Sequence, residues 1–126
     1  MNNERGLGLL EVMVAMFIIA IGVLGLAPLI VLSIEENTVS RDYSTVSSLI
    51  TEKIEYYQGL DSLPTAPFRL YEEGLNNIYS RTTYIDDNSS DSLVPAGLCR
   101  VRVDVAWTDH ENVERSNTMS TYIIPD

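Results

Sequence analysis

The stretch from Leu7 to Ile34 reads LGLLEVMVAMFIIAIGVLGLAPLIVLSI and decides how the chain is organised. Glu11 is its only charged residue, and the 23 residues from Val12 to Ile34 carry no charge. As a helix these residues extend about 34 Å, enough to cross a hydrocarbon core of about 30 Å. A core helix of a soluble protein would show a polar face, and this stretch shows none. The segment therefore predicts insertion into a membrane.

Two simple interpretations of this segment are a cleaved secretory signal and a plain membrane anchor. A secretory signal has an apolar run of only about 7–15 residues before a cut site of small residues, and the nearest candidate, Leu26-Ala27, is followed by Pro28. A plain anchor matches the length but leaves Glu11 unexplained. A carboxylate at the bilayer centre costs at least about 2.5–3.5 kcal/mol, so a charge there indicates a function.

A third interpretation rests on the residues at the start of the run. Gly6 closes a short polar leader, residues 1–6, and is followed by four mostly apolar residues and then Glu11. This pattern resembles the processing signal of type IV prepilins, although Leu7 and Gly8 stand where many members have Phe and Thr. The run LLEVMVAMFIIAIGVLGLA further resembles minor pilins of the PilV type (type IV pilus modification proteins) and, less closely, minor pseudopilins of type II secretion.

The resemblance implies a maturation pathway and a set of partners. A prepilin peptidase/methyltransferase would cut after Gly6 and N-methylate the new terminus on Leu7. The partners would be other major and minor pilin subunits and the inner-membrane assembly machinery. The product would begin as an inner-membrane prepilin and end in a periplasmic or extracellular filament.

Cleavage would give Glu11 a charge partner. The new α-amine on Leu7 has an ordinary pKa of about 7.7–8.0, and its spacing to Glu11 is that of an i, i+4 contact within one helix. As the resemblance implies, the amine of an incoming subunit could instead pair with Glu11 of a subunit already assembled. Pairing offsets the desolvation of both charges and would set the register between subunits. The simpler alternative is that Glu11 is a tolerated charge near the membrane interface.

Gly22, Gly25 and Pro28 form a second cluster within the run. Glycine costs about 1 kcal/mol and proline about 3 kcal/mol in a helix interior, so the helix is expected to loosen or bend here. The functional interpretation is local melting when the chain leaves the bilayer for a filament. The alternative is ordinary close packing or a kink, since both residues are frequent in membrane helices.

The charges that flank the run predict its orientation. Arg5 and the initiator amine, set against Glu4, precede it, and Glu35 and Glu36 follow it. This modest basic bias predicts a single-pass protein with the leader in the cytoplasm and the remainder outside.

Beyond Ile34 the apolar residues become periodic. Spacings of three and four predict an amphipathic helix along the stripe Val39, Tyr43, Val46, Ile50, Ile54 and Tyr57. Gly59 is a typical C-terminal stop. We expect one long helix over residues 7–58, bent near Pro28. Residues 7–34 would form its membrane or filament-core segment, and residues 35–58 would begin a globular part, residues 35–126.

The residue pattern in the rest of the globular part, residues 59–126, predicts a small sheet. Residues 59–77 contain two prolines and two glycines and are expected to form a loop. Alternation predicts strands over residues 78–85 and over Cys99–Thr108, a turn at residues 109–112, and a returning strand over residues 113–124. The expected fold is α+β and pilin-like, with a long helix packed against an antiparallel sheet of three or four strands.

Composition excludes several function classes. A formal net charge of −10 and a pI near 4.3 disfavour nucleic-acid binding. With one cysteine and one histidine, an internal disulfide, a zinc site and a catalytic triad are not expected. No phosphate-binding loop or paired catalytic acids are present, so we expect neither an enzyme nor a cofactor.

Three features of the globular part are candidates for chemistry. The acidic stretch containing Asp86, Asp87, Asn88 and Asp91 could bind calcium, although a solvated acidic loop is the simpler interpretation. Cys99 is expected to be a buried small side chain, with a cross-subunit disulfide as the alternative. His110 is expected on the surface of a turn.

Together these observations predict a structural assembly subunit, a minor type IV pilin of the PilV type that supports pilus assembly, motility or adhesion. One alternative is a minor pseudopilin of a type II secretion system. The other is a single-pass membrane-anchored binding protein that is never polymerised.

Overall fold

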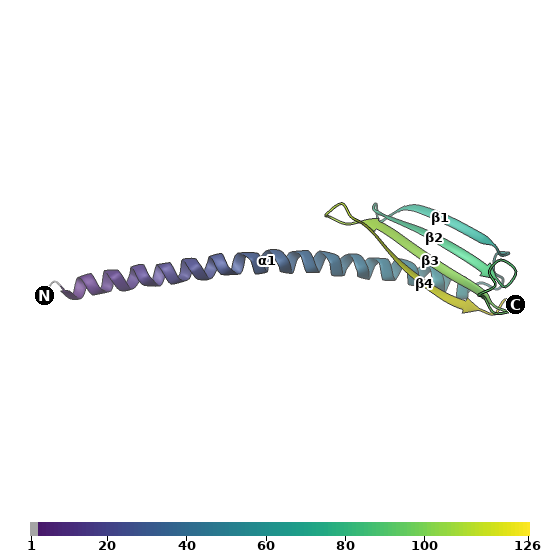
Figure 1. The fold of residues 1–126 in the computed structure, drawn as a ribbon, viewed down its shortest axis with the longest axis horizontal. Coiled ribbons are helices and arrows are strands. Elements are labelled where there is room, and N and C mark those ends of the chain that lie inside the picture. Colours follow the sequence, from purple (N-terminus) through teal and green to yellow (C-terminus); the bar gives the residue numbers. More distant parts are fainter. Residues whose placement is uncertain (1–2) are drawn as a thin grey trace. The chain divides into compact units, whose positions relative to one another are not determined.

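The computed structural model describes the backbone of residues 3–126 and the side chains from Gly8 onward, so Met1 and Asn2 of the predicted leader lie outside the described residues. One helix is followed by four strands (Figure 1): α1 (Asn3–Gln58), β1 (Phe68–Leu75), β2 (Tyr79–Asp87), β3 (Cys99–Thr108) and β4 (Glu114–Ile123). Two compact units divide inside α1, an N-terminal unit that ends at Ser40 and a head comprising residues 41–126.

Helix α1 begins at Asn3, four residues before the predicted start at Leu7. Asn is a favourable residue at a helix start, and Glu4 and Arg5 are good helix formers, so the helix extends into the predicted leader. The helix remains intact on both sides of Pro28. It ends as predicted at Gly59, whose N–H donates to the Glu55 carbonyl at 3.0 Å.

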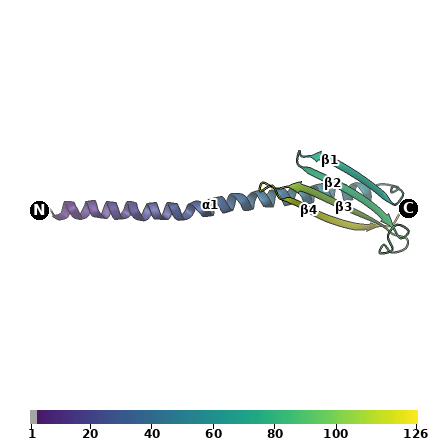
Figure 2. The same ribbon diagram turned by 45° about the horizontal axis from the view of Figure 1, so that its top comes forward.

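The four strands form one antiparallel sheet in the order β1-β2-β3-β4 (Figure 2). Each strand pairs with its neighbour in sequence, as the row Thr83↔Val103↔Met119 shows. The β1–β2 turn uses positive φ angles at Gly74, Asn76 and Asn77, a backbone region that glycine and asparagine enter most readily. The predicted pilin-like α+β fold is confirmed, with four strands.

The core of the head lies between the sheet and the last turns of α1. Alternate residues of β3 are buried as predicted, from Cys99 to Trp107. They face four residues of the predicted helix stripe, Val46, Ile50, Ile54 and Tyr57, together with Leu49. Val39, at the start of the predicted stripe, is 42% exposed. Tyr43 of the same stripe is 45% exposed and places its ring edge-on to Trp107, 5.4 Å between centroids.

Strand β1 was not predicted, because residues 59–77 were expected to form a loop. The apolar–polar alternation of β1 is interrupted by Glu72. This residue lies on the half-buried side of the strand, where an apolar residue is expected. The register to β2 also shifts between Glu72 and Leu75. Glu72 is tolerated there because the buried Arg81 of β2 and the partly exposed Lys53 of α1 pair with its carboxylate.

Candidate functional site

The N-terminal unit exposes nearly all of its apolar surface. Every large apolar side chain from Leu9 to Ile34 is between 49% and 73% exposed. Within the described residues, α1 is the one helix long and apolar enough to cross a membrane, and its most apolar 18-residue stretch has a mean hydropathy of 2.8 with no part buried. The unit therefore has no core of its own and needs an apolar environment supplied from outside.

Glu11 is the only charge on this apolar surface, and its side chain is exposed. It lies four residues after Leu7 on continuous helix, which is about 6 Å along the axis. Gly6 and Leu7 belong to α1 by backbone, and their side chains lie outside the described residues. The helix thus places the predicted new terminus and Glu11 one turn apart.

Gly22 and Gly25 are not held by close packing within the chain. A Cβ built on either glycine meets no heavy atom within 4 Å. Pro28 follows on the same intact helix. These glycines therefore weaken the helix without serving an internal contact.

Sequence reasoning missed a buried ionic cluster in the head. Arg81 on β2 is only 4% exposed. Its Nε and Nη2 donate to the two carboxylate oxygens of Glu72 at 2.9 and 3.1 Å, and its Nη1 donates to the Leu49 carbonyl at 2.8 Å. Lys53 Nζ lies 3.2 Å from the same carboxylate. The Arg81 hydrogen bonds, together with Lys53, hold the pKa of Glu72 below its ordinary value although burial opposes this. The cluster fastens edge strand β1 to α1.

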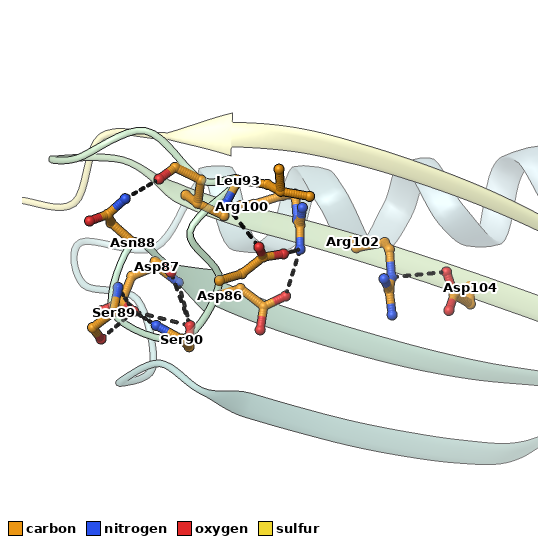
Figure 3. Close-up of polar contacts among 11 residues, drawn as sticks. Asp86, Asp87, Asn88, Ser89, Ser90, Leu93, Arg100, Arg102 and Asp104 are labelled. Atoms are coloured by element: carbon orange, nitrogen blue, oxygen red, sulfur yellow. Dashed lines mark hydrogen bonds and ion pairs between the residues drawn. The ribbon is translucent and has the colours of Figure 1, made fainter.

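The acidic loop after β2 is organised by its own side chains (Figure 3). Asp87 Oδ1 accepts hydrogen bonds from the Ser89 and Ser90 N–H groups at 3.1 and 3.0 Å. Arg100 pairs with Asp86, at 3.1 Å, and with Asp91. Asn88 Nδ2 donates to the Val94 carbonyl at 2.7 Å.

These bonds engage one carboxylate oxygen of Asp86, one of Asp87 and both of Asp91, all of which were candidates for calcium. Hydrogen bonds from Ser89 and Ser90 lower the pKa of Asp87, and bonds from the Leu93 N–H and Arg100 lower that of Asp91. Among the described residues, no group of three or more His, Cys, Asp and Glu side chains is arranged to hold a metal ion. The loop is a braced turn.

The remaining candidates lie as predicted. Cys99 is buried, and its burial raises the pKa of the thiol. His110 is exposed in the β3–β4 turn. Asp109 braces that turn by accepting from the Val113 N–H at 2.9 Å and from Arg115 Nε at 2.9 Å.

Comparison with known proteins bears on the N-terminal unit. Residues 1–27 match the family described as the prokaryotic N-terminal methylation motif. The matched residues include Gly6, Leu7 and Glu11 and end immediately before Pro28. No curated protein and no solved structure matches the chain. The motif implies membrane anchoring, general interaction with pilin subunits and a prepilin peptidase, and a structural rather than an enzymatic role. Together with the fold, it supports a type IV prepilin-like protein.

Proposed function

We propose that the chain is a minor type IV pilin of the PilV type, cut after Gly6, N-methylated on Leu7 and incorporated into a pilus or its initiating tip complex. In the membrane it is a single-pass prepilin with the leader in the cytoplasm and the head outside. From there it is extracted into a filament, where it supports pilus assembly, motility or adhesion.

One observation carries this proposal. Glu11 is the sole charge on a helix surface that is otherwise apolar and exposed from Leu9 to Ile34. A lone carboxylate in this setting is costly unless a cation neutralises it. The amine created on Leu7 lies one helical turn away, about 6 Å along the axis, which is close enough for the two charges to pair.

The proposed pairing of the Leu7 amine with Glu11 would also fix the axial position of each subunit relative to its neighbour. Removing one partner of a buried ion pair costs about 3–5 kcal/mol, because the other charge is left without compensation. A subunit whose amine reaches Glu11 of its neighbour is therefore favoured over one displaced along the helix axis. Glu11 then selects the axial position, while the apolar surface supplies the attraction.

Replacement of Glu11 tests this function in the native host. We expect Glu11→Ala and Glu11→Gln to be cut after Gly6 as in the unchanged protein but to be depleted several-fold from sheared filaments. Glu36→Ala is the matched control, because Glu36 is exposed on the same helix just beyond the apolar segment. Wild-type amounts of the Glu11 variants in filaments, at native expression level, would contradict the pairing.

Deletion separates the proposed role from its alternatives. Loss of the gene product should reduce the number of pili and the motility or adhesion that depends on them. Normal pili with impaired protein secretion would instead identify a minor pseudopilin. A chain that keeps its leader and stays in the membrane would identify an anchored binding protein.

A further inference from the structure

The face of the sheet that turns away from α1 consists of polar and aromatic side chains. Alternate residues of β3 are buried against α1 from Cys99 to Trp107, so the residues between them form the outer face. On β2 and β3 this face carries no aliphatic side chain larger than that of Ala106. The cores of protein–protein interfaces are apolar, so this face is better suited to a polar ligand.

One cross-strand row on the outer face stacks two arginines on a tyrosine. Arg69 of β1, Tyr84 of β2 and Arg102 of β3 lie directly opposite one another in the register. The guanidinium carbons of Arg69 and Arg102 lie 5.3 and 4.2 Å from the centroid of the Tyr84 ring. These cation–π contacts position both arginines without engaging their N–H donors.

Arg100 and Arg102 lie two residues apart on β3 and differ in how their donors are engaged (Figure 3). Arg100 pairs with Asp86 at 3.1 Å and also with Asp91. Arg102 has only Asp104, whose Oδ1 lies 3.5 Å from Nε, and neither of these two buried atoms makes a hydrogen bond. The side chains of Arg102 and Asp104 are 37% and 32% exposed, so the Nη groups and Oδ2 are left to meet a ligand.

A shallow hollow lies beside this row on the same face. Its volume of about 310 Å³ is at the lower end of the range for small-molecule sites. Tyr71, Ser80 and Ala106 are among the residues that line it. Tyr71 is 55% exposed and follows Arg69 by two residues on β1, about 7 Å along the strand. A ligand held by the arginines therefore reaches the hollow.

We propose that the outer face binds a short acidic saccharide, in which one carboxylate-bearing ring is joined to neutral rings. Arg69 and Arg102 hold the carboxylate, because guanidinium groups bind carboxylates with strong, charge-assisted hydrogen bonds. Asp104 Oδ2 accepts a hydrogen bond from a sugar hydroxyl. The next ring lies in the hollow, where its C–H face packs on the Tyr71 ring.

The surrounding charges favour this class over other anions. Asp86, Asp91 and Asp104 lie on or beside the same face, and the chain has a net charge of −10. A nucleic acid or a peptide with several successive carboxylates is repelled by these charges. A saccharide presents one carboxylate to the arginines and neutral hydroxyl donors to the aspartates. The site uses head residues alone and does not depend on cleavage after Gly6 or on a filament.

Calorimetric titration of the full chain in micelles of a sugar-free detergent tests the ligand class. The probes are 3′-sialyllactose and cellobiouronic acid, each with one carboxylate, and the controls are their neutral methyl esters. We expect both acidic probes to bind and the esters to bind at least about tenfold more weakly, because a charged hydrogen-bonding partner is lost. Absence of binding by both acidic probes at millimolar concentration, or equal binding by the esters, would overturn the proposal.

Substitution of the arginines tests the site. Arg69→Gln and Arg102→Gln should each weaken binding of the acidic probes about tenfold. The matched control is Arg115→Gln, because Arg115 is 47% exposed and lies opposite Trp107 on the other face of the sheet. It should bind as the unchanged chain does. Fluorescence of the buried Trp107 reports whether each head is folded. Equal weakening in all three folded variants would indicate a general charge effect and would overturn the site.

Two substitutions of Tyr84 separate its ring from its hydroxyl group. Tyr84→Phe keeps the ring on which both guanidinium groups stack and should retain most of the affinity. Tyr84→Leu removes the ring and should weaken binding about as much as the loss of one arginine. The reverse order in folded variants would contradict the stacked arrangement.

Two further ligands distinguish the saccharide from other carriers of negative charge. Sodium sulfate should displace the acidic probes only weakly, since it lacks the rings that occupy the hollow. A hexaglutamate peptide should bind more weakly than either saccharide. Tighter binding of the peptide that depends on Arg69 and Arg102, or displacement by sulfate at concentrations equal to the probe, would overturn the saccharide as the ligand and leave an adventitious ion site only.

Discussion

Ile18 in the N-terminal unit is 64% exposed, whereas Val103 in the head is fully buried, although both are aliphatic side chains in regular secondary structure. The head buries a set of apolar residues between its own sheet and helix turns. The N-terminal unit covers none, and its exposed surface extends from Leu9 to Ile34. The head is thus a self-contained structure, while the N-terminal unit depends on a bilayer or on other subunits. This contrast is consistent with the proposed subunit, whose N-terminal unit would be surrounded by lipid in the membrane and by other subunits in a filament.

The largest effect is expected from the same charge placed in each unit. Val103→Asp buries a carboxylate without a partner and should cost the head more than about 4 kcal/mol, so that it unfolds. Ile18→Asp should leave the head folded and impair membrane insertion instead. Trp107, the only tryptophan and a buried one, reports head folding by fluorescence. Equal loss of head structure in both variants would contradict the claim that the head folds independently of the N-terminal unit.

A smaller loss is expected when the ionic cluster is opened. Glu72→Ala leaves the buried Arg81 without its bidentate partner and should destabilise the head by about 3 kcal/mol. The neighbouring Glu73 is exposed, and Glu73→Ala should change stability by no more than about 0.5 kcal/mol. Urea denaturation of the full chain in micelles checks this. Similar midpoints for the two variants would show that the cluster does not hold β1.

The same cluster makes the stability of the head depend on pH. The pKa of Glu72 is lowered in the folded state by Arg81 and Lys53, so its contribution is present above the ordinary value near 4.5 and is lost as pH falls through the folded value. The lowered pKa values of Asp87, Asp91 and Asp109 act in the same direction. Unfolding measured from pH 7 to pH 3 should show falling stability, and less steeply in Glu72→Gln. If stability falls equally steeply with decreasing pH in that variant, Glu72 does not contribute to the pH dependence.

The smallest effect is expected in the N-terminal unit. Gly22→Ala and Gly25→Ala meet no steric conflict and should each stabilise α1 by about 1 kcal/mol. Amide hydrogen exchange near Pro28 should slow by about fivefold per substitution, with no change in head stability. Unchanged exchange would mean that these glycines do not loosen the helix.

Much of the fold was predictable because its signals are local. The alternation from Cys99 to Trp107 and the Gly59 helix stop each depend on neighbouring residues. Strand β1 was missed because Glu72 breaks the pattern locally, and it is compatible only with Arg81 and Lys53, which come from β2 and α1. The charges Asp86 and Asp91 were visible in the sequence, but their shared partner Arg100 is set by strand register and loop geometry. Glu11 can be singled out from the sequence because an isolated charge in an apolar run is visible without tertiary information, and its pairing with the amine on Leu7 is part of the proposed function.

Mass spectrometry of the N-terminus of the chain recovered from surface filaments tests the central claim most directly. The proposed function predicts a mature chain that starts at Leu7 and carries an added methyl group on its α-amine. A chain that still begins at Met1 in cells with an active prepilin peptidase would leave Glu11 without its cation and would contradict the filament role.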